Sequence, residues 1–121
     1  MHTKPNPVLT PGGLCTTNDQ DFREYRYPEH IPYCQRNVPF ALQATVLHQY
    51  NIPLVDRDKY KIDHLIPISC GGSNSPDNLW PQPIAEAAEK AKLEQDLYLR
   101  LKAGYIAQAQ AIKEIYNWFY R

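Results

Sequence analysis

Apolar and polar positions alternate with two different spacings along the chain, and each spacing predicts a type of element. Residues 38–50 carry apolar side chains three or four positions apart, which predicts a helix that ends at Asn51-Ile52-Pro53. Residues 60–66 alternate and include β-branched side chains, so they predict a strand. Leu79-Trp80 starts a second apolar piece after a turn-rich stretch, and we expect a short second strand there.

Two further helices are predicted after the second strand. Residues 84–102 have helical spacing with Leu93, Leu97 and Leu101 as a buried stripe, and Gly104 is a suitable C-terminal cap. Residues 106–120 form the last helix, with its apolar side made of Ile112, Ile115, Tyr116 and Phe119. Trp80 and Trp118 are both expected in the core.

The first 39 residues differ from the rest because they contain six of the eleven prolines and few apolar clusters. They predict an irregular, extended arm that wraps the core, with Phe22, Tyr25, Tyr27 and Tyr33 as anchors. The whole chain of 121 residues fits one small α+β domain. We expect an arm at 1–39, then one helix, then a strand–strand–helix unit at 60–102, and a last helix at 106–120.

Most of the candidate chemistry lies in and between the two predicted strands. Asp63-His64 is followed by Pro67, Gly71-Gly72, Asn74 and Asn78-Leu79-Trp80-Pro81. Taken together, these residues resemble the signature of the HNH endonuclease family, whose members carry a ββα metal finger. The resemblance is close over residues 60–83 and looser along the following helix, so it involves about half of the chain.

The resemblance implies a role for each residue of the signature. Cleavage of a phosphodiester needs a base that deprotonates water and a cation that neutralises charge on the phosphate. His64 would be the base, Asp63 a metal ligand, and Asn78 a clamp that ties the loop to the backbone near the base. Adjacent residues of a regular strand point to opposite faces, so we expect a twist or bulge that lets Asp63 and His64 face one phosphate.

The sequence departs from the family at the last metal ligand, because the family commonly has a His or Asn on the helix and no His follows His64. Glu86 is the first candidate for this ligand and Glu89 the second. Both could instead be ordinary acidic residues in the first turn of a helix. Oxygen ligands suit Mg²⁺ or Mn²⁺, and Mg²⁺ is the expected cofactor.

Four basic residues are candidate phosphate contacts, with solvated surface side chains as the alternative. Arg26 and Arg36 lie in a part of the arm that resembles the segment before the finger in a secreted-type branch of the family, and Lys90 and Lys92 lie in the helix. Thirteen basic and thirteen acidic side chains give zero formal charge, unlike a dedicated nucleic-acid-binding domain. Neutrality therefore counts against tight binding rather than against cleavage.

The three cysteines, Cys15, Cys34 and Cys70, form no C-x-x-C pair, which argues against a zinc knuckle. The family resemblance favours a disulfide between Cys15 and Cys34, with Cys70 as a free thiol. The alternative is three reduced thiols in a cytosolic protein. A disulfide would indicate an oxidising compartment, so a secreted or periplasmic location is favoured. No run approaches the ~18 apolar residues of a membrane span.

The expected function is a monomeric, Mg²⁺-dependent endonuclease that acts on DNA, or on RNA as a second choice. Little sequence specificity is expected, because the chain has no helix that resembles a base-reading recognition helix. The missing helix His and the neutral charge motivate an alternative: a degenerate finger that binds nucleic acid or a protein partner without catalysis. A nuclease secreted as a toxin would also need a cognate inhibitor protein.

Overall fold

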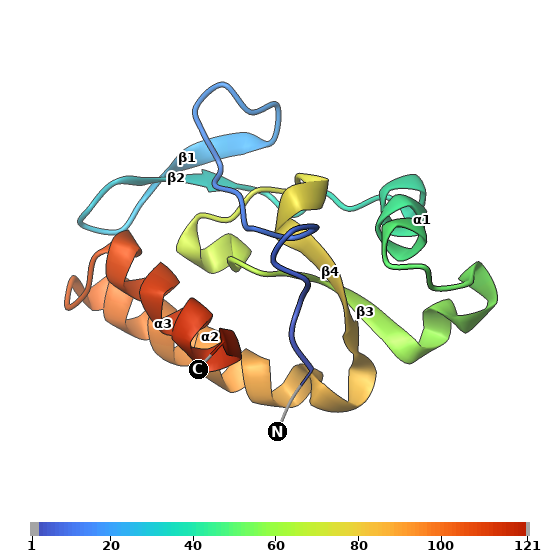
Figure 1. Ribbon diagram of the computed structural model, residues 1–121. Coiled ribbons are helices and arrows are strands. Elements are labelled where there is room, and N and C mark those ends of the chain that lie inside the picture. Colours follow the sequence, from blue (N-terminus) through green and yellow to red (C-terminus); the bar gives the residue numbers. More distant parts are fainter. Residues whose placement is uncertain (1–2, 121) are drawn as a thin grey trace.

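An antiparallel hairpin of β3 (Tyr60–His64) and β4 (Leu79–Pro83) lies at the centre of the protein (Figure 1). The computed structural model describes residues 3–120. The hairpin pairs Tyr60 with Pro83 and His64 with Leu79 without a register shift. Since side chains alternate along a strand, each face of the hairpin receives its own layer of helices. The predicted α+β class and both predicted strands are confirmed.

One face of the hairpin packs on α1 (Phe40–Gln49), the helix predicted at residues 38–50. Val46 and Leu47 of α1 form a buried cluster with Ile62 of β3 and Leu79 of β4. A short 3₁₀ helix, η1 (Leu54–Lys59), joins α1 to β3. His64 lies on this same face, two residues after Ile62.

The other face packs on α2 (Ala87–Ala103) and α3 (Gln108–Tyr120). The main core lies here and contains Leu65, Ile66, Cys70, Trp80, Leu97, Leu101, Ala111, Ile115 and Phe119. Trp80 is buried as predicted, whereas Trp118 is only partly buried against the core. A 3₁₀ turn, η4 (Ile84–Glu86), occupies the first predicted turn of α2, and Gly104 ends this helix in the left-handed conformation that its cap requires.

The N-terminal arm is more regular than its composition predicts. It contains a hairpin of β1 (Phe22–Arg26) and β2 (Ile31–Cys34), whose turn places Tyr27 and His30 at positive φ. Neither residue is a usual turn former, so the sequence carries no hairpin signal at this point. Tyr25, an expected anchor, is 56% exposed, and the two residues before it in the strand are exposed as well.

The arm wraps the central hairpin as expected, and its contacts are specific. Thr10 donates from Oγ1 to the carbonyl of Leu79 at 3.0 Å, and Leu14 forms a β-bridge with Gly72. Gly72 has to be a glycine, because a Cβ built on it would lie 1.8 Å from the carbonyl oxygen of Ile66. The loop between β3 and β4 is thus folded tightly on itself at Gly72, and the bridge to Leu14 joins it to the arm.

The predicted disulfide between Cys15 and Cys34 is present, with its Cα atoms 5.7 Å apart, and Cys70 is a buried free thiol. Burial raises the pKa of Cys70 to about 11, so this thiol is unreactive near neutral pH. The disulfide joins the start of the arm to the end of β2. In residues 3–120, no helix is long and apolar enough to cross a bilayer.

Removing the disulfide should destabilise the protein without changing the central hairpin. A Cys15→Ala/Cys34→Ala variant loses a cross-link over a sequence separation of 19 residues, and the expected cost is about 3 kcal/mol of unfolding free energy. Urea unfolding of wild type and variant measures this difference. Adding a thiol reductant should destabilise the wild type alone, and equal effects on both proteins would contradict a role for this bond.

Candidate functional site

A cavity of about 340 Å³ opens where the arm, β3 and α2 meet. It is lined by charged side chains from all three segments: Arg26 and Arg36 from the arm, Lys61 and Asp63 from β3, and Glu94 from α2. The imidazole of His64, at the end of β3, lines it as well. Pro67, Ile68 and Ser69 of the following loop complete its wall. The cavity thus gathers both residues of the Asp63-His64 pair and two of the four basic candidates.

His64 is buried at the end of β3 and is held through its ring nitrogens. Nε2 lies 3.0 Å from Oδ1 of Asn74, and Nδ1 lies 3.4 Å from a guanidinium nitrogen of Arg36. The ring is only 4% exposed. Asn74 comes from the Gly-rich loop and Arg36 from the arm, so two separate segments fix the orientation of the imidazole.

The contacts of Asn74 decide which nitrogen of His64 carries the proton. The backbone N–H of Asn37 donates to Oδ1 of Asn74 at 3.1 Å, and Nδ2 of Asn74 donates to the carbonyl of Gln35 at 2.8 Å. A backbone N–H can only donate and a carbonyl can only accept, so the amide orientation is determined. Oδ1 must therefore accept from Nε2–H of His64, and the unprotonated Nδ1 accepts from the guanidinium of Arg36, which can only donate.

Burial also keeps this imidazole neutral. Desolvation lowers the pKa of His64 to about 4, while the hydrogen bond to Asn74 raises it and the charge of Arg36 lowers it further. At neutral pH the ring is uncharged, and Nδ1 is able to accept a proton. An unprotonated imidazole nitrogen can act as a general base, and a pKa of about 4 makes it a weaker base than an imidazole that titrates near neutral pH.

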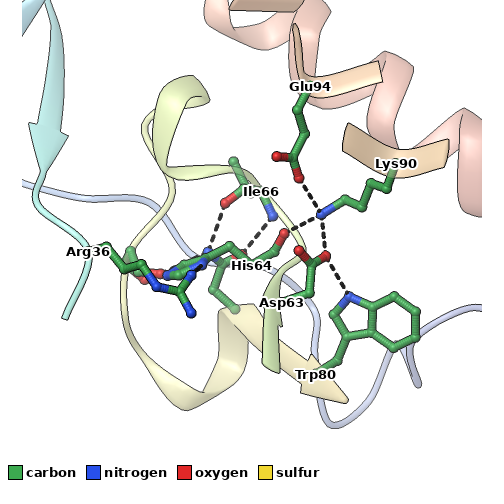
Figure 2. A network of polar contacts seen from close by, with 9 residues as sticks. Arg36, Asp63, His64, Ile66, Trp80, Lys90 and Glu94 are labelled. Carbon is green, nitrogen blue, oxygen red and sulfur yellow. Dashed lines mark hydrogen bonds and ion pairs between the residues drawn. The ribbon is translucent and has the colours of Figure 1, made fainter. Parts of the chain in front are cut away.

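Asp63 faces the opposite way, toward α2, where it forms a buried ion pair (Figure 2). Its Oδ2 accepts from Nζ of Lys90 at 2.5 Å and from Nε1 of Trp80 at 3.2 Å. Lys90 also donates to the backbone carbonyl of His64 and lies 3.2 Å from Oε2 of Glu94. The pKa of Glu94 is raised above its ordinary value, because the effect of burial exceeds the opposing effect of the nearby Lys90 charge.

This geometry corrects the expectation that Lys90 contacts substrate phosphate. Its side chain is 1% exposed and its ammonium group is surrounded by Asp63, Glu94 and the His64 carbonyl. A buried ammonium needs such partners, because taking a charge out of water is costly. Lys92, the other candidate on α2, is exposed and does not line the cavity.

The expected bulge at Asp63 and His64 is wrong. The register of β3 with β4 continues without a shift through both residues, and their side chains leave opposite faces of the strand. They nevertheless both line the cavity, because β3 ends there and the cavity extends around its end. Asp63 is thereby fixed by α2, and His64 by the arm and the Gly-rich loop.

Neither candidate for the helix ligand reaches the cavity. Glu86 accepts hydrogen bonds from the backbone N–H and Oγ1 of Thr3 at 2.5 and 2.7 Å, at the end of β4 away from His64. Glu89 is exposed. Glu94 lines the cavity instead, and it lies beyond the first helical turn in which the sequence predicts the ligand. Its spacing of four residues from Lys90 was the available signal.

Asn78 makes the clamp contacts that its position in the signature predicts. It is fully buried, and its Nδ2 donates to the carbonyls of Ile66 at 3.0 Å and Ser73 at 2.9 Å. Its Oδ1 accepts from the backbone N–H of Ile66 at 3.0 Å and of Gly13 at 3.3 Å. Asn78 therefore holds both ends of the loop and the arm together behind His64.

Both arginine candidates line the cavity. Arg36 is exposed beside His64, and Arg26 stacks over the ring of Tyr33 with its guanidinium carbon 3.5 Å from the ring centroid. Arg26 also pairs with Glu24 at 2.5 Å. Within residues 3–120, no three His, Cys, Asp or Glu side chains are grouped so that they alone could hold a metal.

Comparisons with known proteins found no match for this chain among protein-family models, curated proteins or solved structures. What the cavity does is therefore inferred from its own residues.

The ion pair of Lys90 should be essential for stability. Lys90→Met leaves the carboxylate of Asp63 buried without its cation, and breaking such a pair costs about 3–5 kcal/mol. The exposed neighbour offers a matched control, since Lys92→Met should change the unfolding free energy by less than about 0.5 kcal/mol. Guanidinium unfolding compares the two variants, and equal stabilities would contradict the buried pair.

The neutral state of His64 should appear in the pH dependence of stability. The pKa is about 4 in the folded protein against 6.5 for a free imidazole, so the unfolded chain binds this proton first as pH falls. Stability should therefore be complete above pH 6.5 and decline between pH 6.5 and 4, by up to about 3 kcal/mol. Urea unfolding at several pH values measures the slope.

His64→Gln should remove this part of the slope, and His48→Gln, at an exposed position of α1, should retain it. An unchanged slope in the His64 variant would show that the ring is not buried in its neutral form.

Proposed function

We propose that the protein is a metal-assisted endonuclease of the HNH type that hydrolyses phosphodiester bonds in DNA. The observation that supports it most is the neutral imidazole of His64, whose unprotonated Nδ1 lies 3.4 Å from the guanidinium of Arg36 in a charged cavity. A base and an anion-binding group are thus placed side by side. Cleavage of a phosphodiester by water requires both.

In the proposed mechanism, Arg36 binds a non-bridging oxygen of the scissile phosphate, and Arg26 and Lys61 bind the neighbouring backbone. Arginine suits this task because its planar guanidinium matches two phosphate oxygens. The phosphate then lies next to Nδ1 of His64. Once Arg36 has turned from Nδ1 to the phosphate, Nδ1 takes a proton from a water molecule as the water oxygen attacks phosphorus. The bond between phosphorus and O3′ breaks, and the departing O3′ takes up a proton from solvent. Oδ1 of Asn74, which accepts from Nε2–H, stabilises the resulting imidazolium.

The donor set fits a divalent cation of the Mg²⁺ type, with Asp63 and Glu94 as protein ligands in place of the predicted Asp63 and Glu86. The hydrogen bonds of Asp63 in the described chain go to Oδ2, which leaves Oδ1 as the oxygen to meet a ligand. Mg²⁺ commonly binds one or two carboxylates and completes its shell with water and substrate phosphates. When bound, it would neutralise charge on the phosphate and the departing oxygen. Lys90 already offsets part of the carboxylate charge, so affinity without substrate should be weak.

The surroundings of the site favour weak and unselective binding. The formal net charge is zero and the basic residues of the cavity are few, so the substrate is held by local phosphate contacts. By resemblance to the family, the products would be a 5′-phosphate and a 3′-hydroxyl. The Cys15–Cys34 disulfide supports a secreted or periplasmic enzyme. Secreted as a toxin, the enzyme would need a cognate inhibitor.

Supercoiled plasmid incubated with the protein and Mg²⁺ or Mn²⁺ should be nicked, and a chelator should abolish nicking. His64→Ala should lower the cleavage rate by about 10²–10⁴-fold, because this is the contribution of a positioned general base. His48→Ala is the matched control, since this imidazole lies on α1 outside the cavity. Gel quantification of nicked plasmid measures the rate, and circular dichroism confirms that both variants fold.

Cleavage by His64→Ala at the wild-type rate would refute the mechanism. Retention of plasmid by a wild-type protein that does not cut it would favour the alternative of a non-catalytic binding module.

A further inference from the structure

A buried carboxylate of the arm lies behind His64, at the end of a chain of hydrogen bonds. Asp21 is 8% exposed, and both of its oxygens accept from side-chain amides. Oδ2 accepts from Nδ2 of Asn74 at 2.9 Å, and Oδ1 accepts from Nδ2 of Asn37 at 3.0 Å. In the described part of the chain no ion pair includes Asp21, so its burial depends on these amide donors.

Asn74 links Asp21 directly to the imidazole. Its Nδ2 donates to Asp21 and to the carbonyl of Gln35, and its Oδ1 lies 3.0 Å from Nε2 of His64. All three side chains, those of Asp21, Asn74 and His64, are buried. The carboxylate of Asp21 is thus bonded to the amide of Asn74, and that amide is bonded to the imidazole of His64.

We propose that Asp21, acting through Asn74, is a positioning residue that holds His64 in the tautomer with its proton on Nε2. The consequence for cleavage rests on the proposed function, whereas the tautomer is a property of the protein alone. Asp21 is 43 positions before His64 in the printed sequence and lies outside the HNH-like stretch. Nothing in that stretch would identify it.

The reason lies in what the opposite amide orientation would do. A flipped Asn74 would turn its NH₂ group toward Nε2, which would then have to accept, and the proton of His64 would move to Nδ1. A protonated Nδ1 cannot take a proton from water. Asp21 opposes this flip, because the amide oxygen would then face a carboxylate and the Gln35 carbonyl. The Asn37 N–H opposes it as well, since it would face an NH₂ group.

The residues of the arm that contact Asn74 and His64 lie close to the Cys15–Cys34 disulfide. Asp21 lies between the two cysteines of the disulfide, and Gln35 and Asn37 follow Cys34 closely. Arg36, on the Nδ1 side of the ring, belongs to the same few residues. One cross-linked segment therefore contacts His64 from both sides: directly through Arg36 and indirectly through Asn74.

The test is the protonation pattern of the His64 ring in ¹⁵N-labelled protein at neutral pH, read from long-range ¹H–¹⁵N spectra. Wild type should show a protonated Nε2 and an unprotonated Nδ1. Asp21→Leu removes one of the two acceptors of the Asn74 amide and leaves the Gln35 carbonyl, so the population of the tautomer with its proton on Nδ1 should rise to a detectable level. Asp21→Asn keeps an acceptor, because the Asn37 amide can rotate to meet it, and should restore the wild-type pattern.

Two further variants keep the test decisive. Asn74→Ala keeps Asp21 and removes the amide oxygen that accepts from Nε2–H of His64. It should therefore give a mixture of tautomers, and it can be measured even if Asp21→Leu does not fold. Thr10→Val is the matched control: it removes another buried hydrogen bond between arm and hairpin, and should leave the ring of His64 unchanged. A wild-type pattern in folded Asp21→Leu, or a wild-type pattern in Asn74→Ala, would overturn the proposal.

Plasmid cleavage separates this proposal from the proposed function. If the wild type cleaves, Asp21→Leu should lower kcat by about 10- to 100-fold with little change in KM, as expected for a residue behind the site. A wild type that shows the predicted tautomer without cleaving would refute the nuclease and leave the role of Asp21 intact. A wild type that cleaves plasmid, with the wild-type tautomer kept in the variants, would support the nuclease and refute the role of Asp21.

Discussion

The ion pair between Lys90 and Asp63 is the interaction on which the geometry of the cavity depends. It joins α2 to the last two residues of β3, because Lys90 contacts both the carboxylate of Asp63 and the carbonyl of His64. Trp80, next to it on β4, belongs to the main core and meets Phe119 edge-on with ring centroids 5.4 Å apart. The backbone that carries His64 is therefore fixed by the main core, and the side chain is oriented separately.

This separation explains how a regular strand can place two adjacent candidate residues at one cavity. The side chains of Asp63 and His64 leave opposite faces of β3, so these side chains share no partner: one is held by α2, the other by Asn74 and Arg36. The cavity is lined from both sides of the strand, by His64 on one and by Lys61 and Asp63 on the other. A carboxylate and a neutral imidazole thereby keep different environments although they are neighbours in the chain.

Much of the fold could be predicted from the sequence, because the helices and the central hairpin follow their own periodicity. The Gly71-Gly72 loop and the Asn78 clamp were also predictable, since such turn residues act locally. What could not be predicted depends on contacts between distant segments. The hairpin β1–β2 turns at Tyr27 and His30 without a sequence signal. Lys90 looked like any helical lysine until α2 was placed against Asp63, and Asp21 has no motif of its own.

The arm has a consequence for how the protein could be divided. Residues before α1 supply both arginines of the cavity and the carboxylate behind Asn74. A fragment that starts at α1 would keep every residue of the HNH-like stretch and still lack one wall of the site. Two separately produced pieces, cut between β2 and α1, would each be incomplete, so the cavity would form only where the two pieces reassociate.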